Sequence, residues 1–188
     1  NIDFSLMQNG DLVLETQNEA NTSMIYIEDE VVIDNLTIIP GLRVSHYDIS
    51  DEFYMEPRLS LAYEFDETTQ LRAAFGDYHQ FALSVSRQSI EEGPRNFWTL
   101  ADGETIPVSK ARHFILGATH SVGKYDFNIE LFNKEYEGLS EFTQQTKPKR
   151  NEDGTGLNLI LEQEFHTGSG TASGVELFLQ KNIGNIKG

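Results

Sequence analysis

Cysteine is absent from the sequence, which excludes a disulfide framework and any metal site built from thiolates. Basic residues are scarce, with 14 against 30 acidic ones and a formal net charge of -16. That balance argues against nucleic acid as a partner. No run of about 18 apolar residues is present, so we predict no transmembrane helix. A signal peptide is not visible either, and the strand-like start at Asn1-Ile2-Asp3-Phe4 suggests a fragment of a longer protein.

Sequence motifs of the common catalytic sites are missing as well. There is no G-x-S-x-G, no phosphate-binding P-loop and no H-E-x-x-H. Acidic residues are so numerous that a catalytic carboxylate pair cannot be picked out. The histidines lack the spacing of metal ligands; they are His46, His79, His113, His120 and His166. The sequence therefore predicts no enzyme, no cofactor and no metal site.

Alternation of apolar and polar residues is the strongest pattern that is present. It fills four runs, Thr22–Ile33, Leu36–Asp48, Tyr54–Phe65 and Gln70–Phe81. Strict alternation predicts strands with one apolar face, because successive side chains point to opposite sides. In the third run that face holds Leu59, Leu61, Tyr63 and Phe65. Twelve residues at about 3.3 Å each reach about 40 Å, enough for a strand tilted by about 45° to cross a bilayer core of about 30 Å.

The rest of the chain adds further predicted strands and two long loops. The strands are Asn1–Met7, Ala111–Val122, Tyr125–Glu137 and Thr171–Lys181. We expect Ala82–Lys110 to be a long loop with a helical turn near Ser84–Ile90. Gly138–Gly170 is the second expected loop, within which Leu157–Phe165 could form a strand. The predicted fold is therefore all-β, an antiparallel meander of about eight strands.

The lengths of the connections support a barrel. Tight turns are expected at Asp34-Asn35, Asp66–Thr69 and Gly123-Lys124, and consecutive antiparallel strands bring them to one end of the sheet. The long loops then gather at the other end, as in bacterial outer-membrane barrels. Aromatic residues near the tight turns would form an interfacial girdle; they are Tyr63, Phe65, Tyr125 and Phe127.

Several segments in order along the chain are similar to one known family. They include Tyr26-Ile27-Glu28-Asp29-Glu30, Pro40-Gly41-Leu42-Arg43, Glu56-Pro57-Arg58-Leu59-Ser60-Leu61, Thr69-Gln70-Leu71-Arg72-Ala73-Ala74-Phe75-Gly76, Lys110-Ala111-Arg112-His113 and Gly174-Val175-Glu176-Leu177. Over roughly residues 24 to 180 the chain resembles the barrel of TonB-dependent outer-membrane receptors.

The resemblance implies a barrel of roughly 22 strands, closed by an N-terminal plug. Such receptors take up iron chelates, cobalamin or oligosaccharides across the outer membrane of Gram-negative bacteria. The implied partners are the ligand, the outer-membrane lipid and an inner-membrane energising complex, reached through N-terminal parts that this chain lacks. Residues 1–188 would be a partial barrel domain without plug or barrel ends.

Two groups of residues are candidates for function. Charged residues on the polar faces would point into the lumen; they are Arg43, Glu56, Arg58, Glu64, Arg72, Glu130 and Glu176. There they could contact the plug or line the substrate path, or they could simply pair across strands. Aromatic residues and a histidine near the first long loop could stack on a ligand or pack the loop on itself; they are Tyr78, His79, Phe97 and Trp98.

A second class of function stays open at this point. The chain could be a soluble all-β carbohydrate-binding or adhesion domain, built as a sandwich. The apolar face of Leu59, Leu61, Tyr63 and Phe65 discriminates the two: a sandwich covers it with a second sheet, whereas a barrel leaves it to lipid.

Overall fold

The computed structural model describes residues 2–8, 11–88, 95–150 and 157–181. Twelve strands lie in these ranges: β1 (Ile2–Gln8), β2 (Asp11–Asn18), β3 (Thr22–Glu28), β4 (Val31–Ile33), β5 (Leu36–Tyr47), β6 (Glu52–Asp66), β7 (Thr69–Gln80), β8 (Ala82–Gln88), β9 (Arg95–Leu100), β10 (Ser109–Val122), β11 (Tyr125–Arg150) and β12 (Leu157–Lys181). No helix in the described ranges has the length and apolar character needed to span a membrane.

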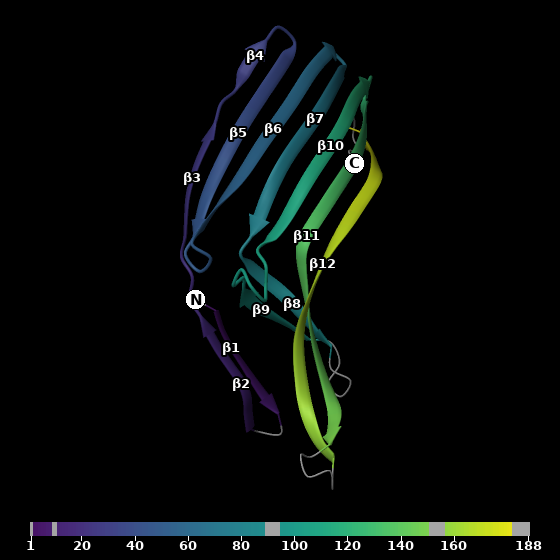
Figure 1. Cartoon of the computed structure of the whole chain (residues 1–188). Helices are drawn as coiled ribbons and strands as arrows, with labels where there is room; N and C mark the ends of the chain where they lie inside the picture. The colour runs from purple at the N-terminus through teal and green to yellow at the C-terminus, as the bar shows by residue number, and fades with distance from the viewer. Residues whose placement is uncertain (1, 9–10, 89–94, 151–156, 182–188) are drawn as a thin grey trace.

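The strands form one large curved sheet and one small hairpin (Figure 1). The large sheet has the order β3-β5-β6-β7-β10-β11-β8-β9, with β4 paired to β5 and β12 paired to β11. The predicted all-β antiparallel meander is confirmed, including the antiparallel pairing throughout the first four runs. One departure occurs outside them, where β8 meets β11 in parallel through two pairs, Phe142↔Arg87 and Thr143↔Gln88.

The connections divide between the two ends of the sheet as the sequence predicts. The tight turns β4–β5, β6–β7 and β10–β11 lie together at the upper end in Figure 1. At the lower end are the β5–β6 connection, the β8–β9 hairpin and the far part of the β11–β12 ribbon. We call these the tight-turn end and the loop end.

Register across the sheet sorts the side chains into two faces. Leu59 pairs with Phe75, and Phe75 pairs in turn with Phe114, so these residues share what we call the outer face. The opposite, inner face carries Arg43 and its partner Glu56. Large apolar side chains on the outer face are exposed; among them are Tyr63, Phe65, Leu116, Tyr125, Phe127 and Leu177. In the described part of the chain no second sheet covers this face, which is the outcome expected of a barrel and not of a sandwich.

The apolar band on the outer face has a definite height. On β10 it runs from Phe114 to Val122, and towards the loop end it gives way to the ion pair of Arg112 with Asp77. Nine residues at about 3.3 Å each, tilted by about 45°, span about 21 Å, close to the apolar band of about 25 Å around outer-membrane barrels. The predicted girdle aromatics are exposed at the tight-turn edge of this band.

The first predicted strand, Thr22–Ile33, is interrupted. β3 ends at the pair Glu28↔Gly41 and β4 resumes at Val31↔Ile38 in the same register. Pro40 lies opposite the gap and has no backbone N–H to donate, although its carbonyl still accepts the N–H of Asp29 at 3.2 Å. The prediction of one continuous strand is therefore wrong, because the strand is interrupted between β3 and β4.

The two predicted long loops contain much more strand than expected. Within Ala82–Lys110 the strands β8 and β9 form a hairpin, and no helical turn forms over Ser84–Gln88; the last residues of that prediction, 89–90, lie outside the described ones. Within Gly138–Gly170 the strands β11 and β12 continue as a paired ribbon. A bulge at Gly138 makes this extension possible, because its φ of 70° is one that glycine adopts without strain.

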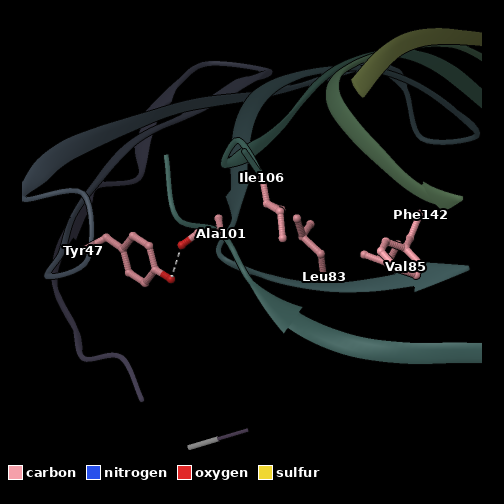
Figure 2. Close-up of a cluster of buried hydrophobic side chains, with 6 residues drawn as sticks. All are labelled: Tyr47, Leu83, Val85, Ala101, Ile106 and Phe142. Atoms are coloured by element: carbon pink, nitrogen blue, oxygen red, sulfur yellow. Dashed lines mark hydrogen bonds between the residues drawn. The ribbon is translucent and has the colours of Figure 1, made fainter. Parts of the chain in front are cut away.

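A small apolar cluster at the loop end attaches the β8–β9 hairpin to the sheet. It joins Tyr47 of β5 and Phe142 of β11 to residues of the hairpin and the following loop; its members are Tyr47, Leu83, Val85, Ala101, Ile106 and Phe142 (Figure 2). The hydroxyl of Tyr47 donates to the carbonyl of Ala101 at 2.8 Å. Tyr47 is the last residue of β5, beyond the apolar band, and burial raises its pKa to about 12.

The loop after β9 is ordered by one carboxylate. Asp102 Oδ1 accepts the backbone N–H groups of Glu104, Thr105 and Ile106 at 2.9, 2.8 and 2.7 Å. This turn places the side chain of Ile106 in the cluster, so a polar contact in the loop determines an apolar contact with the sheet.

Candidate functional site

A cavity of about 560 Å³ lies between the inner face of the sheet and β8, next to the apolar cluster. Its size is within the range of small-molecule sites in proteins, about 300–1,000 Å³. It takes its lining from β5, β7, β8, β10 and β11; the lining residues are Arg43, Tyr78, His79, Gln80, Leu83, Ser84, Ser109, Lys110, Ala111, Tyr136, Leu139 and Ser140. The cavity therefore depends on the hairpin that the sequence did not predict.

One wall of the cavity forms where β6 and β7 separate. Their ladder ends at the pair Arg58↔Gly76, next to Pro57, which has no N–H to contribute. Beyond this point the carboxylate of Glu56 takes the place of the backbone pairing, and its Oε1 accepts the backbone N–H of His79 at 2.6 Å. Glu56 is fully buried, with a relative exposure of 0%. A side chain thus closes the gap between two strands.

The same carboxylate fixes a cation at the cavity. Oε2 of Glu56 accepts a hydrogen bond from Nε of Arg43 on the neighbouring strand. Nη2 of Arg58 lies 3.8 Å from this oxygen, and its guanidinium stands 4.9 Å above the ring of Tyr78. Glu56 therefore connects three strands and also supplies an acid close to Arg58.

A second cation, Lys110, is held less tightly. Its Nζ lies 3.6 Å from Oδ2 of Asp77, a carboxylate that is already engaged by Arg112 through two hydrogen bonds of 2.8 Å. Asp77 is buried, whereas about a third of the Lys110 side chain is exposed. Lys110 and Arg112 share the outer face with Asp77, so the ammonium of Lys110 is paired with this acid on the outer side of the sheet.

Aromatic side chains form another part of the wall. The ring of Tyr78 folds back over Gly76, where a Cβ would lie only 2.6 Å from the tyrosine hydroxyl. Tyr78 also contacts His113 at a ring separation of 5.0 Å, and His113 contacts Tyr136 at 6.3 Å. Two tyrosines of the lining are thus linked through a histidine, which gives the cavity flat apolar surfaces with polar tips.

The structure brings some predicted ligand residues together and leaves others apart. Tyr78 and His79 both line the cavity. Trp98 pairs with Ser84 of the lining, but its indole is 55% exposed and does not reach the cavity. Phe97 lies in β9, and its side chain is outside the described part of the structure. Among the predicted residues whose side chains the structure describes, Tyr78 and His79 line the cavity and Trp98 does not, and their part in ligand binding stays a prediction.

The predicted lumen residues share the inner face. Arg43 and Arg58 lie near the cavity, whereas Arg72 and Glu130 line a separate hollow of about 280 Å³ closer to the tight-turn end. Arg72 crosses Gly117 and donates to Thr119 Oγ1 at 3.2 Å. Glu130 stands directly opposite Glu176, a like-charged pair. Their predicted part in contacting a plug or substrate stays a prediction.

Sequence reasoning missed most of the lining, including Lys110 and Tyr136. Lys110 stood at the end of a predicted loop, and the register of β10 places it on the outer face with Arg112. Tyr136 follows the inner-face alternation of Asp126, Asn128 and Glu130, and extending that alternation would have found it. Leu83 and Ser84 carried no such signal, because their position depends on the fold-back of the hairpin.

Comparison with known families agrees with this geometry. The model of the family described as TonB dependent receptor-like, beta-barrel matches residues 3–186. The chain belongs to this TonB-dependent receptor barrel family. Membership of a receptor family also agrees with the prediction that the chain is not an enzyme, and it excludes the soluble carbohydrate-binding or adhesion domain. A search among curated proteins found no match.

Solved structures share the barrel fold. The siderophore receptor PirA from Acinetobacter baumannii has a TM-score of 0.62 and 15% identity, over 89% of this chain and 26% of its own. PirA from Pseudomonas aeruginosa has a TM-score of 0.61 and 15% identity, over 88% and 32%. The ferric enterobactin receptor PfeA in complex with BCV-L6 has a TM-score of 0.58 and 18% identity, over 88% and 25%. The TonB-dependent receptor barrel described here thus spans about a quarter to a third of these structures.

Proposed function

We propose that the full-length protein is an outer-membrane receptor that captures an iron chelate and transports it with energy supplied through TonB. The observation that carries this proposal is the cavity at the loop end, which lies on the inner face and is bounded by the β8–β9 hairpin. In a receptor the loop end faces the medium, where the ligand is captured. The tight turns face the periplasm and take no part in binding.

The outer face supports the membrane placement. Exposed leucine and aromatic side chains cover a band whose height suits an outer membrane, and charged residues begin only beyond it. The partner of this surface is the outer-membrane lipid of a Gram-negative bacterium. A chain with this face exposed to water would associate with other copies of itself.

The domain proposal is that residues 1–188 are a partial barrel. The remaining strands and the plug would come from parts of the protein outside these residues, since the chain spans only 25–32% of the receptors that it matches. Contact with the inner-membrane energising complex would likewise come from N-terminal parts outside this chain.

An iron chelate suits the cavity better than cobalamin or an oligosaccharide. The three similar structures are all described as receptors for siderophores or ferric enterobactin. Arginine and tyrosine side chains of the lining suit the charged oxygen donors and flat rings of iron-chelating compounds. The structure gives no corresponding reason for either alternative.

Uptake of radioiron tests this function directly. The full-length gene is expressed in a Gram-negative host without siderophore receptors of its own, and uptake is measured for a panel of ferric chelates. We expect uptake of at least one chelate in cells with TonB and none in a matched strain without TonB. Uptake that does not depend on TonB would contradict the proposal. So would a receptor that transports cobalamin or an oligosaccharide and none of the chelates.

A further inference from the structure

A groove near the tight-turn end takes no part in the proposed function. Its volume is about 330 Å³, and most of its lining residues belong to the outer face by register; they include Ala118, His120, Phe127, Ile129, Leu177 and Leu179. The lining comes from β7, β10, β11 and β12 and is mainly apolar. The groove therefore lies on the surface that would meet lipid.

One small side chain opens this groove. Register places Ala118 in a row across four strands with larger apolar residues, which are Leu71, Ile129 and Leu177. Those three side chains are exposed by 45%, 42% and 77%, so they stand up from the sheet on both sides of the alanine. A flexible acyl chain fits such a gap, because its methylene groups make the dispersion contacts that the short alanine side chain leaves unmade.

The groove becomes polar towards the tight-turn end. In the next outer-face row Nδ1 of His120 lies 2.9 Å from Oγ1 of Thr69. In the row after that Tyr125 pairs with Lys181, and Lys124 lies in the adjacent turn between β10 and β11. Successive rows on one face are two residues apart, so about 13 Å separates Ala118 from the row of Lys181. An apolar floor and a basic rim thus lie within the reach of one lipid molecule.

The basic rim is unusual in a chain with 30 acidic and 14 basic residues. Lys124 is exposed and Lys181 is half-buried, and neither forms an ion pair with another described residue. Asp126, the acid next to the same turn, belongs to the inner face, where its Oδ1 accepts the hydroxyl of Ser121 at 2.7 Å. The other acids of this end, Asp66 and Glu67, lie at the β6–β7 turn. The rim therefore complements an anionic headgroup.

We propose that this groove binds an anionic glycerophospholipid of the periplasmic leaflet, with one acyl chain over Ala118 and the phosphate between Lys124 and Lys181. The inference rests on the proposed membrane placement, with the tight turns towards the periplasm, and not on the ligand that is transported. Lysine suits this depth because its stem packs along apolar surface while its ammonium reaches the headgroups. Tyr125 stands beside Lys181 in the last row, at the level where amphipathic rings meet the membrane interface.

The test compares two lipids with identical acyl chains on the full-length receptor in detergent. Phosphatidylglycerol carries a net negative charge, whereas phosphatidylcholine is zwitterionic. Native mass spectrometry during a lipid titration gives the dissociation constant of the first bound lipid, for the native protein and for Lys124→Gln, Lys181→Gln, the double variant with both glutamines and Ala118→Leu.

Two variants serve as matched controls. Lys134→Gln removes a lysine of β11 that register places on the inner face, where its Nζ stands 5.1 Å from the ring of Phe132. Ala73→Leu enlarges an outer-face alanine in the row of Leu116, outside the groove. Each control should change either dissociation constant by less than about twofold, because neither residue touches the proposed lipid.

The lysines and the alanine should affect different parts of the lipid. We expect each lysine variant to weaken phosphatidylglycerol by about fivefold, the effect of one basic residue near an anionic lipid surface, and phosphatidylcholine by less than about twofold. The double variant should bind the two lipids with nearly equal affinity. Ala118→Leu should weaken both lipids by about the same factor, on the order of fivefold, because it fills the place of the acyl chain and leaves the charges intact.

Other outcomes overturn the inference. Equal affinity of the native protein for both lipids, or lysine variants that behave like Lys134→Gln, excludes a headgroup site at this rim and leaves the receptor function standing. Ala118→Leu that binds lipid as Ala73→Leu does excludes the groove as the place of the acyl chain. A full-length protein that stays monomeric in water without detergent overturns the membrane placement as well. Heat-modifiable mobility on gels confirms that every variant is folded, so weaker binding is not a result of misfolding.

Discussion

Replacing Glu56 by alanine should destabilise the barrel more than any other single acid-to-alanine change on β6. The fully buried carboxylate accepts the N–H of His79 and the guanidinium of Arg43, and it lies near Arg58. Its removal leaves a backbone donor and two cations without their acceptor at a place where no β6–β7 ladder bond can replace them.

The magnitude follows from the exposure of those partners. Breaking a buried ion pair costs about 3–5 kcal/mol, and an unsatisfied buried N–H costs about 1–3 kcal/mol. About a third of each of the side chains of Arg43 and Arg58 is exposed, so water can solvate the cations that remain. Because of this solvation we expect a loss near the lower limit of the first range, about 3 kcal/mol, for the two effects together.

Urea unfolding of the refolded full-length receptor in lipid vesicles measures this loss, with heat-modifiable mobility as the readout. Glu64→Ala is the matched control, because Glu64 is an exposed acid on the same strand and face that accepts a hydrogen bond from Gln70. Its effect should stay within about 0.5 kcal/mol. Equal stability of the Glu56→Ala and Glu64→Ala proteins would refute the claim that a side chain closes the gap between β6 and β7.

Three further predictions concern the cluster, the outer face and the cavity rim. The pKa of Tyr47 is about 12 in the folded protein, against an ordinary value of about 10. Its contribution to stability is therefore complete below about pH 10 and is lost as the pH rises through about 12. The urea midpoint should fall between these two pH values, and Tyr47→Phe should remove the part of the fall that is due to this hydroxyl. Leu116→Lys on the outer face should cost about 2–4 kcal/mol in lipid vesicles, whereas Thr119→Lys on the inner face should cost less than about 1 kcal/mol, and equal costs would contradict the assignment of faces. Trp98→Ala should weaken binding of the transported ferric chelate less than Tyr78→Ala, since Tyr78 lines the cavity and Trp98 does not. The reverse order of dissociation constants would place the ligand on β9.

The sequence predicts the sheet well because one face of each strand is apolar. Leu59, Leu61, Tyr63 and Phe65 alternate with polar residues, and this pattern determines both the strand and its register. The ribbon beyond Gly138 was predicted only in part, as a possible strand over Leu157–Phe165. In β11 the residues from Thr143 to Arg150 include no large apolar side chain apart from Pro148, so the apolar alternation that marks a half-buried strand is missing there.

The candidate site was only partly predictable. Tyr78 and His79 could be found because they end a clearly alternating run, and Arg43 because it lies on a polar face. The cavity itself needs β8 to fold back onto the inner face, and that contact depends on distant partners such as Tyr47 and Phe142. Long-range packing of this kind leaves no periodic trace in a local stretch of sequence, and Glu–Pro at positions 56–57 gave no sign of the gap that it closes.

The ladder between β6 and β7 is bounded at both ends. It runs from Arg58↔Gly76 to Glu64↔Gln70, with Pro57 beyond one end and a bulge before Asp66 beyond the other. A misalignment by two residues would keep every side chain on its own face, so apolar patterning alone does not reject it during assembly. In one direction, however, it brings a residue without an N–H into the ladder, and in the other it moves the bulge into regular pairing. Proline and bulge together leave one alignment in which the backbone groups between them are all paired. This disfavours a shifted register between β6 and β7 while the barrel folds.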